Sequence, residues 1–393
     1  MKSKQTLNFI KNNAGLLLHL ASRYILYEPY RAFFICFSIA AVISVILVID
    51  GFQQGLYLQL RNVVVNRNAD LILTQAGISN MIAARSIIPQ HTRLDVEAIK
   101  GVREAHPLTG ISAIYEKNGR RNPVFVLVYD TKGGPIQLEQ GTPISKSHQI
   151  IIDHSLAALY GLKPGDTFIL SDYKFKIAGI SSGAVALFTP FAFMKYDDLL
   201  DYYMESDIAA DISTFPLLSF LLVDLDDKED PLVVAKRIEQ AVPSVDVFTP
   251  EALANNDVKL GRELFGPIMN LLLMVSYIIG LLSVGMVIFT NTYTRTRSLA
   301  LIRALGAPIE MVAGFITLET AFLILLSFPV AIVIALLLAH LIPRFAPIYL
   351  ILPTEPVTLI RTFTACILFS LAGALMAMRL TAKVEPDIAF RYA

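Results

Sequence analysis

The 393-residue sequence contains no tryptophan and only two cysteines, Cys36 and Cys366, both inside long apolar runs. Two thiols in such surroundings do not predict a disulfide or a zinc site built on cysteine. Charged residues make up only 17% of the chain and the formal net charge is zero, so the composition gives no bulk attraction to nucleic acid. These absences argue against a disulfide-stabilised protein, a cysteine-based zinc protein and a protein that binds nucleic acid through its bulk charge.

Motifs for nucleotide binding and catalysis are also missing. The sequence has no GxxxxGKS or GxxxxGKT loop and no GxGxxG after a strand. Its six histidines are scattered, without HExxH or another paired ligand spacing, so we predict no metal site. Asp153, His154 and Ser155 have the residue types of a hydrolase triad, but a helix N-cap explains such sequence neighbours better. We predict no catalytic residue and no cofactor bound by this chain.

Apolar residues are abundant: they make up 54% of the chain, and the mean hydropathy is +0.57. Four runs are long enough to cross a bilayer core of about 30 Å. We predict transmembrane helices at residues 32–50, 266–290, 311–342 and 357–378. The fold class is therefore an α-helical membrane protein with four transmembrane helices and a large α+β extracytoplasmic domain, residues 51–265, between the first and second spans.

The predicted α+β domain opens and closes with helical segments. GFQQGLYLQLRNVVV has the spacing of a helix that continues from the first span as a stalk, and PEALANNDVKLGRELFGP leads into the second span. Inside the domain, the helix-then-strand pattern of LDVEAIKGV-REAHPL recurs in PLVVAKRIEQAV-SVDVFTP. This recurrence indicates two related α/β units with an insertion between them. TFIL and FKIAGIS alternate as a hairpin would.

The basic residues orient the chain. Three segments are rich in lysine and arginine, namely 1–31 (which also has the pattern of an amphipathic interfacial helix), 291–310 and 379–393. The short loop at 343–356 has only Arg344. The positive-inside rule therefore places both termini and 291–310 in the cytoplasm, and residues 51–265 on the opposite side.

Two charged residues fall within the apolar runs. Glu319 would cost about 2.5–3.5 kcal/mol to insert as an ion, which makes an intramembrane acid a functional hypothesis. The alternatives are a structural glutamate bonded to a neighbouring helix, a glutamate near the wet interface, or a substrate contact; we favour the structural role. Arg361, near the outer end of the fourth span, could pair with Glu355 or reach the interface.

The loop between the second and third spans reads NTYTRTRSLALIRALGAP. Leu299, Ile302 and Leu305 have helical spacing, and the arginines can project elsewhere. Spacing alone leaves two hypotheses open: an interfacial helix that only satisfies the orientation rule, or a helix that docks into a soluble partner.

TRTRSLALIRALGAP resembles the cytoplasmic signature of MacB/FtsX-type (type VII) ABC transporter permeases, roughly E-R-x-x-E-I-G-x-x-R-A-L-G-A. The match is tight at Arg295 and over 303–307, whereas Ser298 and Ala300 stand where the family commonly has Glu and Gly. GFQQGL resembles the start of the family's stalk, IIIDHSLAALYGLKPGDTFILSDYKFKIAGI its external segment, and VEPDIAFRYA its closing motif. The order of spans agrees with DevC-like and Lol-like members.

The resemblance implies a permease of the bacterial cytoplasmic (inner) membrane that works with a separate dimeric ATPase, which would bind ATP and Mg. It also implies a second permease copy and, in some members, a periplasmic membrane-fusion adaptor and an outer-membrane channel. ATP-driven movement of the α+β domain (mechanotransmission) would export or extract a hydrophobic or amphipathic substrate. The alternative is an FtsX-like transmitter that regulates an extracytoplasmic partner such as a cell-wall hydrolase.

The resemblance also implies roles for particular residues. The helix that couples to the ATPase would contain Arg295, Arg297, Leu299, Ile302, Arg303, Ala304, Leu305, Gly306 and Ala307. The start of the stalk would contain Gly51, Phe52, Gly55 and Leu56.

Overall fold

The computed structural model describes residues 27–82, 84–117, 119–186, 188–207, 217–295, 301 and 307–382. They form two compact units. The membrane unit comprises the chain up to Gln54, Ile268–Leu341 and the chain from Ile351; the α/β unit comprises Gly55–Pro267 and Ile342–Leu350.

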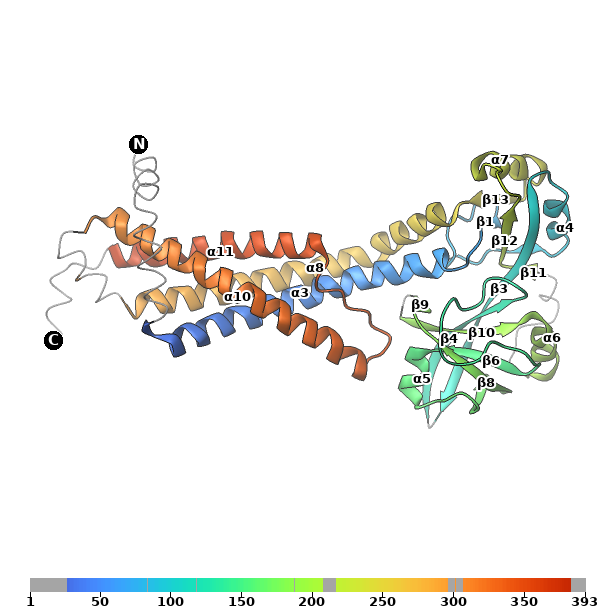
Figure 1. The fold of residues 1–393 in the computed structure, drawn as a ribbon, viewed down its shortest axis with the longest axis horizontal. Helices are drawn as coiled ribbons and strands as arrows, with labels where there is room; N and C mark the ends of the chain where they lie inside the picture. Colours follow the sequence, from blue (N-terminus) through green and yellow to red (C-terminus); the bar gives the residue numbers. More distant parts are fainter. Residues whose placement is uncertain are drawn as a thin grey trace. The chain divides into compact units, whose positions relative to one another are not determined.

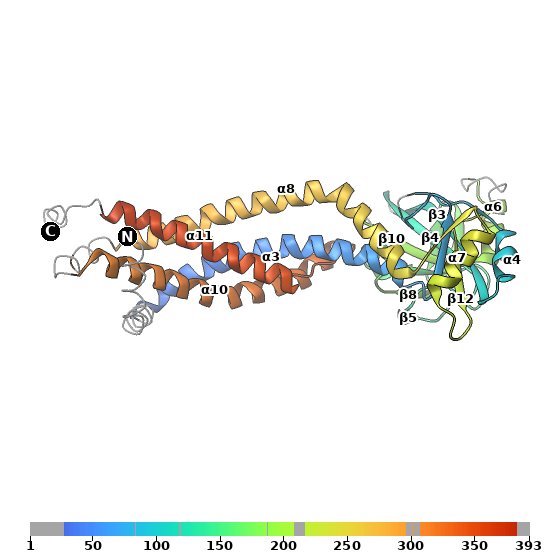
Figure 2. The same cartoon turned by 90° about the horizontal axis from the view of Figure 1, so that it is seen from above.

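The membrane unit is built from four long helices. They are α3 (Pro29–Val65), α8 (Pro250–Tyr293), α10 (Ile309–Phe345) and α11 (Pro356–Ala382). Each contains a stretch long and apolar enough to cross a membrane, which agrees with the four predicted spans. In both views α10 and α11 run alongside the apolar parts of α3 and α8 (Figures 1 and 2).

Side chains from these helices form a shared core. Buried residues include Ile43 and Leu47 from α3, Ile288 from α8 and Ala335 from α10. Many large apolar side chains, such as Leu282, point outward instead. An apolar outer surface of this extent is the arrangement expected of helices in lipid.

Two of the helices are longer than a span requires. As predicted from the stalk pattern, α3 continues past Asp50 to Val65 without a break. Helix α8 begins well before the second span, at Pro250, and contains Pro267 inside the helix. Both helices contribute residues to the membrane unit and to the α/β unit.

The α/β unit contains two βαβ segments that share one part of the sheet. The first consists of β1 (Leu71–Gln75), α4 (Thr92–Glu97) and β3 (Val102–Lys117). The second consists of β12 (Phe220–Leu225), α7 (Pro231–Ala241) and β13 (Val245–Phe248). The antiparallel order is β13-β1-β12-β3, so each segment places one strand between the two of the other, as in a ferredoxin-like split βαβ fold. The predicted pair of related α/β units is confirmed.

The insertion between these segments continues the same sheet. Beyond β3, the order is β4 (Arg120–Tyr129), β10 (Thr189–Lys195), β6 (Gln149–Asp153), β8 (Tyr173–Ser181) and β5 (Leu138–Gly141). Helices α5 (His154–Tyr160) and α6 (Tyr196–Glu205) lie in this part (Figure 1). The remaining short strands are β2 (Ile88–Pro89), β7 (Thr167–Leu170), β9 (Val185–Ala186) and β11 (Leu217–Leu218).

The predicted hairpin is confirmed, because β7 and β8 pair antiparallel over Thr167–Leu170 and Tyr173–Lys176. Alternation along these strands buries Phe168, Phe175 and Ile177 in the core of this part of the sheet. The alternating pattern of the sequence thus translates directly into one buried face.

Candidate functional site

A buried ion pair joins α10 to the end of α8 in the membrane unit. Nη1 of Arg295 lies 2.5 Å from Oε1 of Glu319, and the two side chains are only 8% and 7% exposed. Arg295 follows α8 in a turn closed by its N–H to the carbonyl of Thr292, at 3.1 Å. The guanidinium also lies over the ring of Phe315, with Cζ 5.8 Å from the centroid. Each charge is therefore compensated inside the helix bundle.

Arg31, near the start of α3, extends this contact to a third helix. It donates to the carbonyl of Asn291 at 3.2 Å and to Oγ1 of Thr294 at 2.5 Å, both at the C-terminal end of α8. Carbonyls at the C-terminal end of a helix have no partner within the helix, and a cation there also interacts favourably with the negative end of the helix dipole. Asn291 in turn donates to Glu319 at 3.5 Å. We call Arg31, Asn291, Thr294, Arg295 and Glu319 the polar cluster.

The polar cluster gives Glu319 a structural explanation. The carboxylate is paired with an arginine and receives an amide donor, which offsets the cost of burying it. Among the alternatives that the sequence left open, bonding to neighbouring helices is the one observed. The partner could not be found from the sequence because residues 295 and 319 come together only when α8 and α10 pack.

Most of the predicted coupling helix lies outside the described residues. Those residues are Arg297, Leu299, Ile302, Arg303, Ala304, Leu305 and Gly306. Of the others, Arg295 belongs to the polar cluster, and half-buried Ala307 lies two residues before α10 begins. The segment thus starts at the polar cluster, and its docking role stays a prediction.

The glycines at the predicted start of the stalk allow another part of the chain to approach α3 closely. A Cβ on Gly55 would lie 1.9 Å from the carbonyl oxygen of Leu350, and one on Gly51 would lie 2.7 Å from the carbonyl carbon of Leu352. The N–H of Leu352 donates to the carbonyl of Gly51 at 3.0 Å. No other residue fits such approaches without a backbone shift. The i, i+4 spacing puts both glycines on one face of α3.

The other two residues of this stretch belong to the same helix, α3. Leu56 is buried and Phe52 half-buried. One turn further, Gln59 donates from Nε2 to the carbonyl of Ile348 at 3.0 Å. The chain between α10 and α11 is therefore held against α3 by the carbonyl of Gly51 and by the side chain of Gln59.

A second ion pair in the membrane unit joins α3 to α11. Arg361 pairs with Asp50, whereas the sequence left open a pair with Glu355 or a side chain that reaches the interface. Asp50 is fully buried, whereas the side chain of Arg361 is 46% exposed. The sequence did not indicate Asp50 as the partner, because only the packing of distant helices brings α3 close to Arg361.

Within the α/β unit, the extended parts of α3 and α8 contact each other. Arg61 donates to both carboxylate oxygens of Glu251 at 2.7 Å. A Cβ on Gly261 would lie 2.4 Å from Cδ1 of Leu60, so glycine permits a close helix approach here. Asp257 of α8 is buried and accepts from the N–H of Met81 at 3.0 Å, which ties this helix to the loop after β1.

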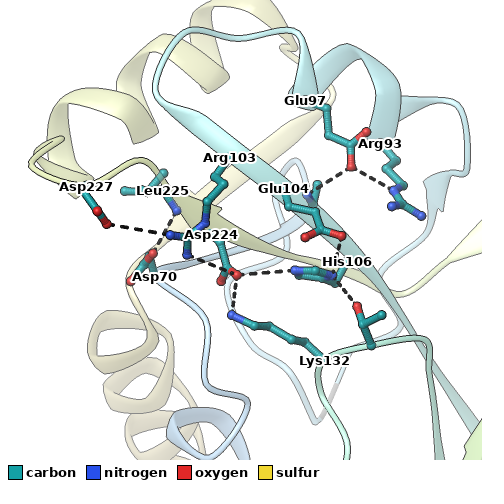
Figure 3. Close-up of polar contacts among 12 residues, drawn as sticks. Asp70, Arg93, Glu97, Arg103, Glu104, His106, Lys132, Asp224, Leu225 and Asp227 are labelled. Carbon is teal, nitrogen blue, oxygen red and sulfur yellow. Dashed lines mark hydrogen bonds and ion pairs between the residues drawn. The ribbon is translucent and has the colours of Figure 1, made fainter.

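The α/β unit contains a second group of interacting charged and polar side chains, the ion-pair network, which has the residue types of a catalytic triad (Figure 3). Nδ1 of buried His106 lies 2.7 Å from Oγ1 of Thr131, and its Nε2 lies 3.5 Å from Oδ2 of Asp224. Lys132 pairs with the same Asp224 oxygen, and Arg103 lies 3.6 Å from it. Burial raises the pKa of Asp224, but Lys132 and His106 outweigh this effect and leave the pKa below its usual value.

This arrangement fits an ion-pair network better than a catalytic site. In a triad the carboxylate hydrogen-bonds to the histidine and orients it. Asp224 instead also pairs with two cations, Lys132 and Arg103, from elements other than its own strand. The network links β3, β12 and the loop after β4. No pattern in the sequence indicates this network, because its members come from three separate segments.

The predicted N-cap at Asp153 is confirmed. Oδ1 of Asp153 accepts from the N–H of Ser155 at 2.8 Å and from its hydroxyl at 2.6 Å, at the start of α5. His154 points to Glu139 instead, with Nδ1 2.7 Å from Oε2. The serine hydroxyl donates to the cap and does not face the histidine, so these neighbours form no triad.

Comparison with known families assigns both units. Residues 32–241 match the model of the MacB-like periplasmic core domain. Residues 270–386 match that of the FtsX-like permease C-terminal domain. The two matches follow each other along the chain and include all four membrane helices in part or whole.

Individual proteins resemble the chain along its length. The uncharacterized ABC transporter permeases Rv0072 and MT0078 of two Mycobacterium tuberculosis strains are each 22% identical over 383 residues, covering 95% of this chain and 99% of their own. Two solved structures are more distant. The periplasmic region of MacB from Actinobacillus actinomycetemcomitans is 11% identical, with a TM-score of 0.36 over 48% of this chain and 92% of its own.

The second structure is the extracellular domain of the noncanonic ABC-type transporter YknZ from Gram-positive bacteria. It is 8% identical, with a TM-score of 0.34 over 46% of this chain and all of that domain. The assignment rests on the family models, of which the first alone covers more than half of the chain. The chain therefore belongs to the family of MacB/FtsX-type ABC transporter permeases, multi-pass membrane proteins with a MacB-like periplasmic core domain between the first two membrane helices.

Proposed function

We propose that this permease couples ATP hydrolysis by a separate ATPase to movement of its α/β unit, and that this movement exports or extracts a hydrophobic or amphipathic substrate. ATP and Mg would be bound by the ATPase, and this chain would bind no cofactor. The observation that carries the proposal is that α3 and α8 each run unbroken from the membrane unit into the α/β unit.

Continuous helices suit the transmission of motion because their backbone hydrogen bonds resist bending, and Pro267 removes one of these bonds from α8. At one end, Arg31 and Arg295 connect α3, α8 and α10 next to the predicted coupling segment. At the other, Arg61 and Glu251 connect α3 and α8 within the α/β unit. A displacement applied at 296–306 would thus act on helices that are cross-linked to each other.

The proposal also includes the partners of the permease. The family implies an ATPase, and we propose that it binds the segment containing Arg303 and Leu305 from the cytoplasm. A second copy of the permease would cover part of the apolar surface that the four helices expose. A periplasmic membrane-fusion adaptor and an outer-membrane channel would then receive the substrate. Both chain termini would be cytoplasmic, in the inner membrane of a bacterium.

Affinity purification from detergent extracts, with ATP and vanadate present to trap the ATPase, tests this proposal. Recovery of an ABC ATPase with a hairpin-type adaptor would support export. Recovery of an ATPase with a peptidoglycan hydrolase would replace export by FtsX-like signalling. Recovery of the intact permease without any ATPase would contradict the coupling mechanism.

A further inference from the structure

Three side chains of the α/β unit converge at a place that the proposed function does not use. His148 precedes β6, and Asp198 and Asp201 lie one turn apart on α6. One nitrogen or oxygen atom from each lies within 4.8 Å of those of the other two. The site is formed by two segments about fifty residues apart in sequence, which explains why the spacing of the histidines did not predict it.

Asp198 is the buried member of this group. It is completely inaccessible, and its Oδ1 accepts from the hydroxyl of Ser147 at 2.6 Å and from the N–H of His148 at 2.8 Å. Its Oδ2 has no hydrogen-bond partner among the described residues. A buried carboxylate oxygen without a partner carries a substantial free-energy cost unless something binds to it.

Tyr173 provides a second buried group without a partner. Its side chain is 94% buried, and its hydroxyl has no hydrogen-bond partner among the described residues. Two buried polar groups, Oδ2 of Asp198 and the hydroxyl of Tyr173, therefore lack a hydrogen-bond partner among the described residues of this part of the α/β unit.

His148 has an unusual backbone conformation and defined neighbours. Its φ angle is 64°, in the left-handed region that few residues other than glycine adopt. Its ring stacks on that of Tyr173 with centroids 5.6 Å apart, and its Nδ1 lies 2.9 Å from the hydroxyl of Ser147. Ser147 thus contacts both His148 and Asp198, as residues that orient metal ligands commonly do.

We propose that His148, Asp198 and Asp201 bind a divalent first-row transition cation such as Zn²⁺. An imidazole with two carboxylates is a ligand set that such cations accept, whereas Mg²⁺ and Ca²⁺ prefer oxygen alone. Tetrahedral zinc holds its ligands about 2.0–2.2 Å from the metal and so about 3.4 Å from one another. The exposed His148 and half-exposed Asp201 have room to close that difference, and water would complete the coordination.

The cation would connect the loop before β6 to α6. It would also neutralise two carboxylates that lie one helical turn apart, for which no ion pair is found among the described residues. The α/β unit would consequently become more stable when zinc is present.

Titration of the full-length protein in detergent tests the site. Zn²⁺ binding is measured by calorimetry, and Co²⁺ binding by the visible absorption of a tetrahedral site. We expect one saturable cation per chain and a higher melting temperature when it is bound. H148N retains a residue that tolerates the left-handed conformation, and D198N retains an acceptor at Oδ1; these variants and D201N should each weaken binding at least tenfold.

Asp197→Asn is the matched control, because Asp197 is exposed on the same helix and outside the group. It should bind the cation as the unmodified protein does. Circular dichroism shows whether D198N folds; if it does not, the exposed positions 148 and 201 decide. Absence of saturable binding, unchanged binding in H148N and D201N, or equal weakening by D197N would each overturn the proposal.

Discussion

The two ion pairs of the membrane unit have different environments. In one, both Arg295 and Glu319 are more than nine-tenths buried. In the other, Asp50 is fully buried, but almost half of the Arg361 side chain is exposed. The first pair belongs to a cluster that joins three helices, whereas the second joins α3 to α11.

This difference indicates how each pair contributes. When both charges are buried, the loss of one leaves the other in a medium of low dielectric constant. When the arginine reaches solvent, it can be hydrated after its partner is lost. We therefore expect the Arg295–Glu319 pair to be the more sensitive, and it also contains the first residue of the predicted coupling helix, Arg295.

The largest expected effect comes from replacing a buried carboxylate by its amide. Glu319→Gln removes the negative charge beside Arg295 without changing the shape of the side chain. We expect a destabilisation of about 3 kcal/mol, measured by chemical unfolding of the detergent-solubilised protein. The double variant Arg295→Met with Glu319→Leu should recover much of the loss. Equal stability of E319Q and the unmodified protein would contradict the assigned contact.

A smaller effect is expected where the helices approach a loop without any charge. Gly55→Ala would place a methyl group against the carbonyl of Leu350 and should cost about 2 kcal/mol through overpacking. Gly285→Ala is the matched control, since nothing lies within 4 Å of its Cβ position, and it should be neutral or slightly stabilising. Similar melting temperatures for the two variants would show that the close approach at Gly55 does not exist.

The ion-pair network of the α/β unit should make the stability of the protein depend on pH through Asp224. Because the folded pKa of Asp224 is lower than the unfolded value of about 3.9, its stabilisation is present above that value. It is lost as pH falls through the folded pKa. Lys132→Met should cost about 1.5 kcal/mol at neutral pH and start acid unfolding at a higher pH.

Lys163→Met is the control, because this lysine is exposed and no ion pair of its side chain is found among the described residues. Acid denaturation curves followed by circular dichroism compare the two variants. If the curves for K132M and K163M coincide, Lys132 does not stabilise the ionised form of Asp224 as we expect.

The half-exposed pair should respond least. Asp50→Asn removes a charge from a position that is as buried as Glu319, but Arg361 can then turn to solvent. We expect a loss of about 1 kcal/mol in the same unfolding measurement that is used for E319Q. A loss in D50N as large as that in E319Q would show that exposure of the arginine does not determine the difference.

The sequence predicted what depends on local pattern. Four apolar runs became α3, α8, α10 and α11, alternation became the β7–β8 hairpin, and Asp153 became an N-cap. Recurrence of a helix-strand pattern indicated the two βαβ segments that share the sheet.

Contacts between distant elements could not be predicted in this way. Arg295 and Glu319 are each visible as unusual residues, yet nothing in one sequence shows that they meet. The same holds for Asp50 with Arg361, where the sequence offered the neighbouring Glu355 or the interface as alternatives. The cluster around Asp198 depends on the orientation of α6 against the loop before β6, which is set by the packing of the sheet.

The coupling of ATP hydrolysis to the α/β unit is tested most directly by the double variant Arg303→Ala with Leu305→Ala. The complex with its ATPase is reconstituted in lipid, and ATP turnover is measured together with substrate release. Leu341→Ala with Arg344→Ala, which removes the same residue types near the other loop, serves as the matched control. We predict that the first variant inserts normally but loses release relative to ATP turnover, whereas the control keeps both. Full ATPase association with normal release in the first variant would contradict the account.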